Sequence, residues 1–415
     1  MSELSYLEKL LDGVEVEWKT LEDITLRTSN IKWREVIRSY RYIDLTSVDI
    51  ATKKITETTE ITKNNAPSRA QKLVDENDVI FATTRPTQQR FCLIDSEYAG
   101  EVASTGYCIL RAKQDQVLPK WILHWISTSD FKKHVEENQS GSAYPAISDS
   151  KVKECLIPIP CPDNPEKSLA IQSEIVRILD KFTALTAELT AELTAELNMR
   201  KKQYNYYRDQ LLSFDEEQEK PIYLEKLLDG VEVEWLPLSD LARIRNGKDH
   251  KSLSEGEFPV YGSGGIMRYV DTYAYNKPSV LIPRKGSLGN LFFIDVPFWT
   301  VDTIFYTEID EAQIRPKYLY YFLSTVGLGE MNQAGGVPSQ TQSVLNKLKI
   351  PIPCPDNPEK SLAIQSEIVR ILDKFDTLTN SITEGLPREI ELRQKQYEYY
   401  RDLLFSFPKP ETASN

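Results

Sequence analysis

Residues 157–182 read IPIPCPDNPEKSLAIQSEIVRILDKF, and residues 350–375 repeat this stretch without a change. The segments before the two copies, 19–156 and 236–349, share almost no sequence. Two shorter stretches are also duplicated, YLEKLLDGVEVEW at 6–18 and 223–235, and QYNYYRDQLLSF at 203–214, which returns as QYEYYRDLLFSF at 396–407. Repeats of 20–50 residues usually indicate a fixed-period array. Two units of roughly 200 residues instead predict duplicated domains with pseudo-two-fold symmetry.

The repeated stretch opens a long helix. Asn164 is suited to cap it and Pro165 to its first position. Its apolar residues are then spaced alternately by four and three, the 3.5-residue period of a coiled-coil seam, at Ile171, Ile175, Ile178, Phe182, Leu185 and Leu189. This pattern predicts one helix over 166–213, about 70 Å long.

The second half of the chain matches this helix position by position, except that Gly385 and Pro387 should kink or break it. Two long helices with matched seams most simply pack on each other in antiparallel fashion. The alternative is that each helix packs only on its own insert.

Residues 183–197 read TALTAELTAELTAEL, with leucine every four residues. Alanine, glutamate and leucine favour helix over disorder, and a four-residue spacing in a heptad background locally unwinds a supercoil. The run is either a ruler between the two inserts or an inert product of repeat slippage. The residues alone leave both open.

Both inserts show strand and turn signals. Residues 78–82 and 91–94 predict two strands joined by a polar loop, and residues 280–283 and 291–294 predict the same arrangement in the second insert. A second polar, glycine-bearing segment lies at 139–144 in the first insert and at 333–341 in the second. The inserts are therefore expected to share one fold with different loop chemistry.

Charge separates the frame from the inserts. The chain has a net charge of −12, yet segment 19–156 holds 20 basic and 19 acidic residues, and 236–349 holds 12 and 11. The acidity thus belongs to the repeated frame, and each insert is free to present a basic face. Total charge therefore does not exclude nucleic acid.

Several kinds of chemistry lack their motif. The sequence has no GxxxxGK[ST] phosphate loop, no methyltransferase tetrapeptide and no CxxC, and its three histidines form no cluster. Acidic residues at 162–167 and 355–360 faintly suggest a nuclease pair, but helix starts favour acidic residues in any case. We expect no metal site, no disulfide framework, no leader peptide and no membrane span, hence a soluble chain in a reducing cytoplasm.

With its unlike inserts between repeated stretches, the chain resembles the specificity (S) subunits of type I restriction–modification systems over essentially its whole length. The TAEL run points to the IC branch of these HsdS proteins. The resemblance implies an α+β fold, in which two globular α/β target-recognition domains are separated by two long antiparallel coiled-coil helices. Each domain would read one half of a bipartite, asymmetric site on double-stranded DNA.

The resemblance also implies partners. Two modification (M) subunits would bind this chain to form an adenine-N6 methyltransferase, and restriction (R) subunits would add translocation and cleavage. The chain itself is expected to be non-catalytic and to bind no cofactor, because S-adenosylmethionine, ATP and magnesium would belong to the partners. In this family the TAEL copy number is understood to set the spacer between half-sites, which favours the ruler.

The expected domains are 1–156 (repeat and first target-recognition domain), 157–222 (first helical spacer), 223–349 (repeat and second target-recognition domain) and 350–415 (second helical spacer). The family's DNA-contacting loops carry over, loop by loop, to six residues of each insert. These are Arg85, Gln88, Gln89, Arg90, Ser142 and Tyr144 in the first, and Arg284, Lys285, Ser287, Asn290, Gln340 and Thr341 in the second. Arginine pairs with guanine edges and glutamine or asparagine with adenine, although a lone polar loop is more often a solvated hairpin tip.

Two other classes of protein remain open from sequence. A standalone two-headed DNA-binding regulator or architectural protein would bind its site tightly without partners. A pure assembly scaffold would lose nothing when the loop arginines were removed.

Deleting one Thr-Ala-Glu-Leu unit should shorten the preferred spacer between half-sites and leave both half-site sequences unchanged. Four residues of helix span about 6 Å, which is one to two base-pair steps of DNA. Mapping modified adenines in cells that express this chain with its M partner measures the spacer. Unchanged spacing after the deletion would contradict the ruler.

Overall fold

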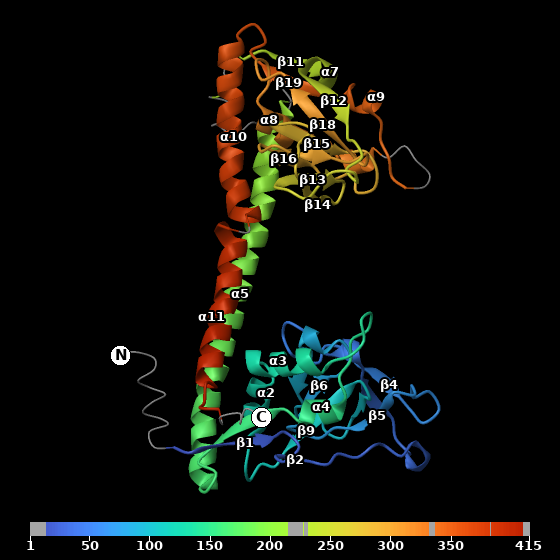
Figure 1. Cartoon of the computed structure of the whole chain (residues 1–415), viewed down its shortest axis with the longest axis vertical. Coiled ribbons are helices and arrows are strands. Elements are labelled where there is room, and N and C mark those ends of the chain that lie inside the picture. Colours follow the sequence, from blue (N-terminus) through green and yellow to red (C-terminus); the bar gives the residue numbers. More distant parts are fainter. Residues whose placement is uncertain (1–13, 215–226, 228–230, 332–336, 382, 410–415) are drawn as a thin grey trace. The chain divides into compact units, whose positions relative to one another are not determined.

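The computed structural model describes residues 14–214, 227, 231–331, 337–381 and 383–409. Most of the two YLEKLLDGVEVEW copies and the predicted loop residues 333–336 lie outside these ranges. The chain divides into two compact units (Figure 1). Unit 1 comprises 1–191 together with 391–415, and unit 2 comprises 192–390. Each unit thus holds one insert and parts of both halves' helical regions.

Unit 1 contains two four-stranded sheets and a two-stranded ribbon. The first sheet has the order β2-β9-β6-β7 and is antiparallel, the second has the order β4-β3-β8-β5 with β3 and β8 parallel, and β1 pairs with β10. The strands are β1 (Val16–Thr20), β2 (Thr25–Leu26), β3 (Tyr40–Ile43), β4 (Thr59–Ile61), β5 (Ala70–Leu73), β6 (Val79–Ala82), β7 (Phe91–Leu93), β8 (Val102–Ser104), β9 (Tyr107–Ala112) and β10 (Leu156–Pro160).

Unit 2 repeats this plan. Its sheets have the orders β12-β18-β15-β16 and β14-β13-β17, with β13 and β17 parallel, and β11 pairs with β19. The strands are β11 (Val233–Pro237), β12 (Ala242–Asn246), β13 (Phe258–Gly262), β14 (Gly265–Val270), β15 (Ser279–Pro283), β16 (Phe292–Ile294), β17 (Trp299–Thr300), β18 (Ile304–Ile309) and β19 (Lys349–Pro353). The prediction that the inserts share one fold is confirmed, as are the predicted strands β6, β7, β15 and β16.

Shorter helices and turns complete each unit. Unit 1 has α2 (Pro119–Trp125), α3 (Ser129–Asn138) and α4 (Asp149–Lys153), and unit 2 has α7 (Leu238–Leu241), α8 (Pro316–Leu323) and α9 (Gln342–Leu345). The 3-10 turns are η1 (Trp33–Glu35), η2 (Leu45–Ser47), η3 (Pro86–Gln88), η4 (Ser96–Tyr98) and η5 (Leu328–Glu330).

The long helices begin and break where the sequence predicts. Helix α5 (Pro165–Ser213) has 49 residues, and the Asn164 side chain accepts a hydrogen bond of 3.0 Å from the Lys167 amide. In the second half, α10 (Pro358–Asn380) ends before α11 (Gly385–Leu404) begins. Gly385 has φ +75°, and a Cβ there would lie 2.5 Å from the Thr377 carbonyl oxygen, so the break requires glycine.

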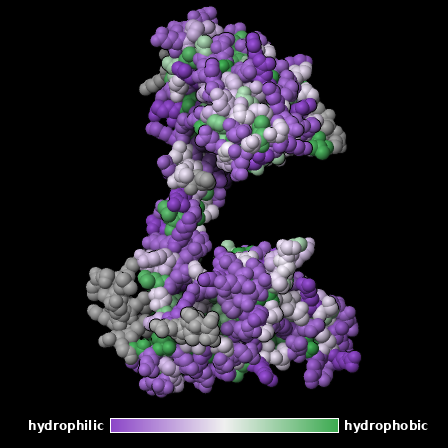
Figure 2. All heavy atoms as spheres, viewed as in Figure 1, coloured by the Kyte–Doolittle hydropathy of each residue, from purple (hydrophilic) through white to green (hydrophobic). Residues whose placement is uncertain are grey.

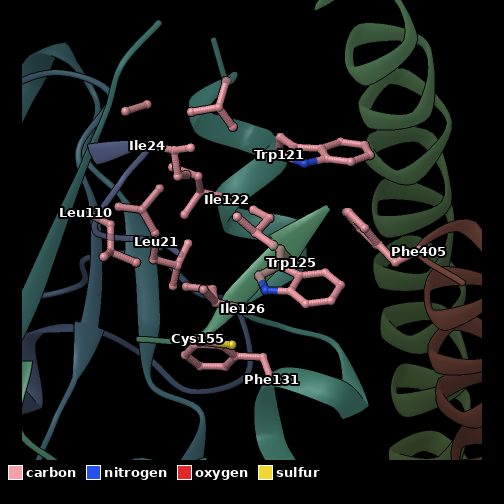
Figure 3. Close-up of a cluster of buried hydrophobic side chains, with 14 of the residues drawn as sticks. Leu21, Ile24, Leu110, Trp121, Ile122, Trp125, Ile126, Phe131, Cys155 and Phe405 are labelled. Atoms are coloured by element: carbon pink, nitrogen blue, oxygen red, sulfur yellow. The ribbon is translucent and has the colours of Figure 1, made fainter. Parts of the chain in front are cut away.

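Each unit fills its core with a segment from the other half of the chain. In unit 1, the aromatic face of α2 packs on the end of the second half: Trp121 lies 4.6 Å and Trp125 5.5 Å from Phe405, between ring centroids. Figure 3 shows both indoles on the side of α2 that faces Phe405, whereas Ile122 lies toward Leu110 of β9.

In unit 2, the end of the first half has the same role. Leu211, Leu212 and Phe214 are buried in one cluster with Tyr318 of α8 and Leu372 of α10. These three residues occupy the repeat positions of Leu404, Phe405 and Phe407. The core of unit 1 therefore joins two separate stretches of sequence, 1–191 and 391–415, whereas unit 2 is one continuous stretch, 192–390, that begins within the helix of the first half.

The helices within each unit pair in antiparallel fashion, as predicted. In unit 1, Phe182 stacks on Tyr400 at 5.6 Å, and Ile175, earlier on α5, shares a cluster with Leu404, later on α11. In unit 2, the equivalent rings Phe375 and Tyr207 stack at 5.5 Å.

The seam is less buried at the start of the TAEL run than before it. Ile175 is fully buried, whereas Leu185 is 51% exposed. Leu189, Leu193 and Leu197, which follow Leu185 at four-residue spacing, are half-buried. The boundary between the two units falls inside this run, after Ala191. On the face of each unit shown in Figure 2, the surface is mostly hydrophilic, with small scattered hydrophobic patches.

Replacing Phe405 with alanine should destabilise unit 1 by about 3–5 kcal/mol, because the cavity it leaves faces Trp121 and Trp125. Hydrogen exchange should rise in α2 and β9 and stay unchanged in unit 2. Leu212→Ala, at the equivalent repeat position, is the matched control and should raise exchange in unit 2 alone. Equal effects of both variants in both units would contradict the exchanged packing.

Candidate nucleic-acid interface

Two polar segments of unit 1 form one surface. The loop between β6 and β7 (83–90) lies beside the segment 139–146, because the Arg85 amide donates to the Pro145 carbonyl at 2.7 Å and the Ile147 amide to Thr83 at 2.9 Å. A β-bridge joins Thr84 to Ala146. Residues more than 50 positions apart are thereby fixed in one place.

The outer side of this surface carries four of the predicted contact residues. Arg85, Gln88, Ser142 and Tyr144 are exposed, and Tyr144 is 71% exposed. The Arg85 guanidinium lies over the Tyr144 ring, 5.3 Å from its centroid, which orders both side chains. Arg85 also has a left-handed backbone (φ 51°) directly before a proline, a conformation that costs on the order of 1–3 kcal/mol. Such strain is typical of functional loops.

The other two predicted residues of unit 1 face inward. The Arg90 guanidinium donates to the Leu45 and Val48 carbonyl oxygens, both at 2.6 Å, and so ties the β6–β7 loop to the connection 44–58. The Gln89 side chain is buried, and its backbone carbonyl accepts a hydrogen bond from Lys53. These contacts assign Arg90 and Gln89 to the shape of the loop.

Lys53 is a supporting residue that sequence reasoning missed. Its ammonium lies 4.3 Å from the Phe91 ring centroid. Burial lowers the pKa of Lys53 to about 8; Arg90 and Arg401 lower it further, whereas Asp49 opposes the shift. No sequence signal could have found it, since Lys53 is 36 residues from Gln89.

Unit 2 builds its surface with the same backbone bonds. The Gly286 amide donates to Pro338 at 2.8 Å, the Gln340 amide donates to Arg284 at 3.0 Å, and a bridge joins Lys285 to Ser339. Matching these bonds to unit 1 makes Gly286 the structural equivalent of Arg85. Both have positive φ, 83° and 51°, so the same turn is built once from glycine and once from arginine.

The predicted residues of unit 2 also divide between the two sides. Lys285, Ser287, Asn290 and Thr341 are exposed. The Lys285 ammonium lies 3.9 Å from Asp302, and the Asn290 side chain donates to the Ser263 carbonyl at 3.1 Å.

Arg284 and Gln340 instead turn inward. The Arg284 guanidinium is 5.8 Å from the ring of buried Phe305, and Gln340 is 2% exposed, with its amide donating to Pro283 at 2.5 Å. As with Arg90 in unit 1, these contacts shape the loop rather than its outer surface.

The basic-aromatic stretch at 32–42 is used within unit 1. The structure forms the 3-10 turn η1 and the strand β3 there. The Arg38 guanidinium lies 3.7 Å from the Tyr40 ring centroid, and Arg41 pairs with Glu97 at 2.8 Å.

Other chemistry has little support in the described parts of the chain. No group of three His, Cys, Asp or Glu side chains there could hold a metal ion. Burial raises the pKa of Cys92, Cys108 and Cys155 to about 12, so these thiols stay protonated at neutral pH. Among the helices described, none is long and apolar enough to cross a bilayer.

A family model described as the type I restriction modification DNA specificity domain matches residues 15–199 and 230–392. The chain belongs to this family. It is 41% identical to the type I restriction enzyme EcoR124I/EcoR124II specificity subunit of Escherichia coli, over the whole of both chains. It is 35% identical to the EcoprrI specificity subunit of the same species, over 92% of this chain and 93% of the relative.

Solved structures of type I proteins share the fold. A chain from work on complex assembly and conformational transition of the type I R-M system matches with TM-score 0.69 at 20% identity, covering 94% of this chain and 97% of that one. The HsdS subunit from Thermoanaerobacter tengcongensis matches with TM-score 0.51 at 19% identity, covering 94% and 96%. As a type I specificity subunit, the chain is a DNA-recognition component without catalysis of its own.

Lys53→Met should change how the stability of unit 1 depends on pH. The folded pKa of about 8 lies below the ordinary value of 10.5, so between these pH values the unfolded chain binds more protons than the folded one. The contribution of Lys53 to the unfolding free energy therefore rises with pH across this window. In chemical denaturation, the unfolding free energy of wild type should increase relative to that of Lys53→Met from pH 8 to 10.

Lys54→Met is the matched control for this measurement, because Lys54 is exposed. The unfolding free energy of Lys54→Met should differ from that of wild type by the same amount at every pH. A Lys53→Met curve parallel to wild type would show that the ammonium titrates as in solvent.

Proposed function

We propose that this specificity subunit reads a bipartite, asymmetric site on double-stranded DNA, with unit 1 reading one half-site and unit 2 the other. The observation that carries this proposal is the pair of matched loop surfaces. The same backbone bonds hold both, yet the exposed side chains differ: Arg85, Gln88 and Tyr144 in one, and Lys285, Ser287 and Asn290 in the other. Two loop surfaces with the same backbone support but different hydrogen-bond donors and acceptors suit two different DNA sequences.

The proposed contacts follow from the chemistry of the exposed groups. Arg85 suits the O6 and N7 acceptors of guanine, and Gln88 and Asn290 suit adenine. Ser142, Ser287 and Thr341 can serve phosphates or bases, and Lys285 suits a phosphate or guanine. The inward residues Gln89, Arg90, Arg284 and Gln340 would position these groups, since a preformed surface loses less entropy on binding.

The repeated frame is the proposed docking surface for two M subunits. Two copies of one partner need two equivalent surfaces, and the frame supplies identical residues on both halves. The exposed pair Glu174–Arg177 is repeated as Glu367–Arg370, with the same contact of 2.7 Å. The M subunits would then methylate adenine N6, and R subunits would cleave unmodified DNA.

The partners, in this proposal, hold S-adenosylmethionine, ATP and magnesium, and this chain holds none of them. Membership in the type I family supports this division of labour. The assembly would work in the cytoplasm, where the cell's DNA lies. A standalone two-headed DNA-binding regulator or architectural protein is the second candidate, since the two loop surfaces alone would suit it equally. Specific, stable binding without M subunits would favour that candidate.

Arg85→Ala should weaken discrimination at one base position of one half-site by about 1–3 kcal/mol, because a bidentate arginine–guanine contact is lost. Mapping methylated adenines in cells that also express the M partner measures base preference at every position. The other half-site should not change.

Arg38→Ala is the matched control, since this exposed arginine of unit 1 donates to Gly100 at 2.7 Å, within the domain. It should leave both half-sites unaltered. A uniform loss over all sequences in Arg85→Ala would make that residue a phosphate contact. Unchanged methylation by both variants would contradict the assignment of this surface to DNA.

A further inference from the structure

A tight hairpin of unit 2 lies against the loop 284–291. The hairpin joins β13 to β14 through Ser263 and Gly264. The Asn290 side chain donates to the Ser263 carbonyl at 3.1 Å, and a Cβ on Gly286 would lie 3.3 Å from the Ser263 hydroxyl. The hairpin and the proposed reading loop are thus neighbouring parts of one surface.

The hairpin exposes large apolar side chains. Ile266 is 50%, Met267 59% and Tyr269 48% exposed. Side chains added at Gly264 or Gly265 would meet nothing within 4 Å, so the tip is open on its outer side. In its sheet as described, β14 pairs with β13 alone. Edge strands normally carry charge rather than apolar groups, and an apolar cluster there marks a contact surface.

The charge around this apolar cluster indicates its partner. Segments 262–269 and 284–291 contain no aspartate or glutamate, and Lys285 is their exposed basic residue. Arg268, half-buried, donates to the Leu253 carbonyl at 3.1 Å, and Arg284 faces inward. Asp302, 3.9 Å from Lys285, borders these segments from outside. An apolar cluster beside a basic side chain suits DNA, because the apolar groups can contact base edges while the basic group faces a phosphate. It suits the acidic repeated frame of a second copy of this chain less well.

Unit 1 places a different segment in the same position. Strand β3 runs parallel to β8 as β13 runs parallel to β17, so the connection 44–58 corresponds to the hairpin. Arg90 donates to Leu45 and Val48 of this connection, and Lys53 of the connection donates to Gln89. In both units the chain leaving this strand abuts the reading loop, with unrelated sequence and length.

We propose that the hairpin 262–267 is a further DNA-reading element of unit 2, and that Ile266 and Met267 contact thymine methyl groups of its half-site. Apolar side chains recognise the 5-methyl group of thymine in the major groove. This inference rests on the proposed reading of one half-site by each unit. A half-site that carries a methylated adenine also carries a thymine opposite it, so at least one such methyl group is available.

The test removes the methyl groups from the DNA. Binding of the complete complex with its M subunits is measured on duplexes in which deoxyuridine replaces thymine in one half-site at a time. The half-site that responds to Lys285→Ala is assigned to unit 2. Wild type should bind about fourfold more weakly for each contacted methyl group lost from that half-site, the value of one buried methyl or methylene group. The double variant Ile266→Ala, Met267→Ala should bind thymine and deoxyuridine duplexes equally.

Two controls separate this effect from general damage. Val296→Ala removes another exposed apolar side chain of unit 2, and Ile37→Ala one of unit 1. Both should keep the wild-type ratio between thymine and deoxyuridine DNA. Deoxyuridine in the half-site of unit 1 should affect wild type and the double variant alike.

Three results would overturn the inference. Wild type could fail to distinguish thymine from deoxyuridine in the half-site of unit 2, or the double variant could keep the wild-type ratio. The double variant could also lose M subunits on co-purification while keeping that ratio, which would make the hairpin a protein-docking surface. Failure of the proposed function is a separate result, since wild type would then methylate no bipartite site at all.

Discussion

The structure depends on one constraint: each unit completes its hydrophobic core with the C-terminal end of the other half's helical region. Phe405 fills the space beside Trp121 and Trp125, and Leu212 occupies the matching position in unit 2. Burying each aromatic or leucine side chain contributes about 1.5–3 kcal/mol. Each domain therefore needs the antiparallel helix pair to fill its core, and each helix pair needs the domain to bury its C-terminal apolar residues.

The same constraint explains which residues of the frame are duplicated. The side-chain oxygen of Gln172 accepts a hydrogen bond from the backbone amide of Leu118 at 2.9 Å. The side-chain oxygen of Gln365 accepts one from the backbone amide of Arg315 at 2.8 Å. Asp180 binds His124 at 2.9 Å, and the equivalent Asp373 binds Tyr321 at 2.6 Å. The frame anchors both inserts with the same side chains, so the inserts can differ in sequence wherever they do not meet it.

The two matched loop surfaces show how one fold carries different side-chain chemistry in its two copies. Backbone bonds between the β6–β7 loop and the 139–146 segment recur in unit 2, while the side chain at the left-handed position changes from Arg85 to Gly286. Inward cations and amides hold each loop from behind, and the outward residues are free to vary. The side chains on the outer surface can therefore change without altering the contacts that support the loop.

The sequence by itself determined the elements and their duplication. The helix cap at Asn164, the strands at 78–82 and 280–283 and the break at Gly385 depend on near neighbours, and the structure agrees with each of them. The repeats also indicated one fold for both inserts and antiparallel helices. Only the tertiary structure decided which polar loop residues face out, because Arg85 and Arg90 have the same local character. Long-range partners separate them: Tyr144 orders Arg85 at the surface, and the carbonyl groups of Leu45 and Val48 bind Arg90 from within. Such partners are brought together by packing, which no local pattern records.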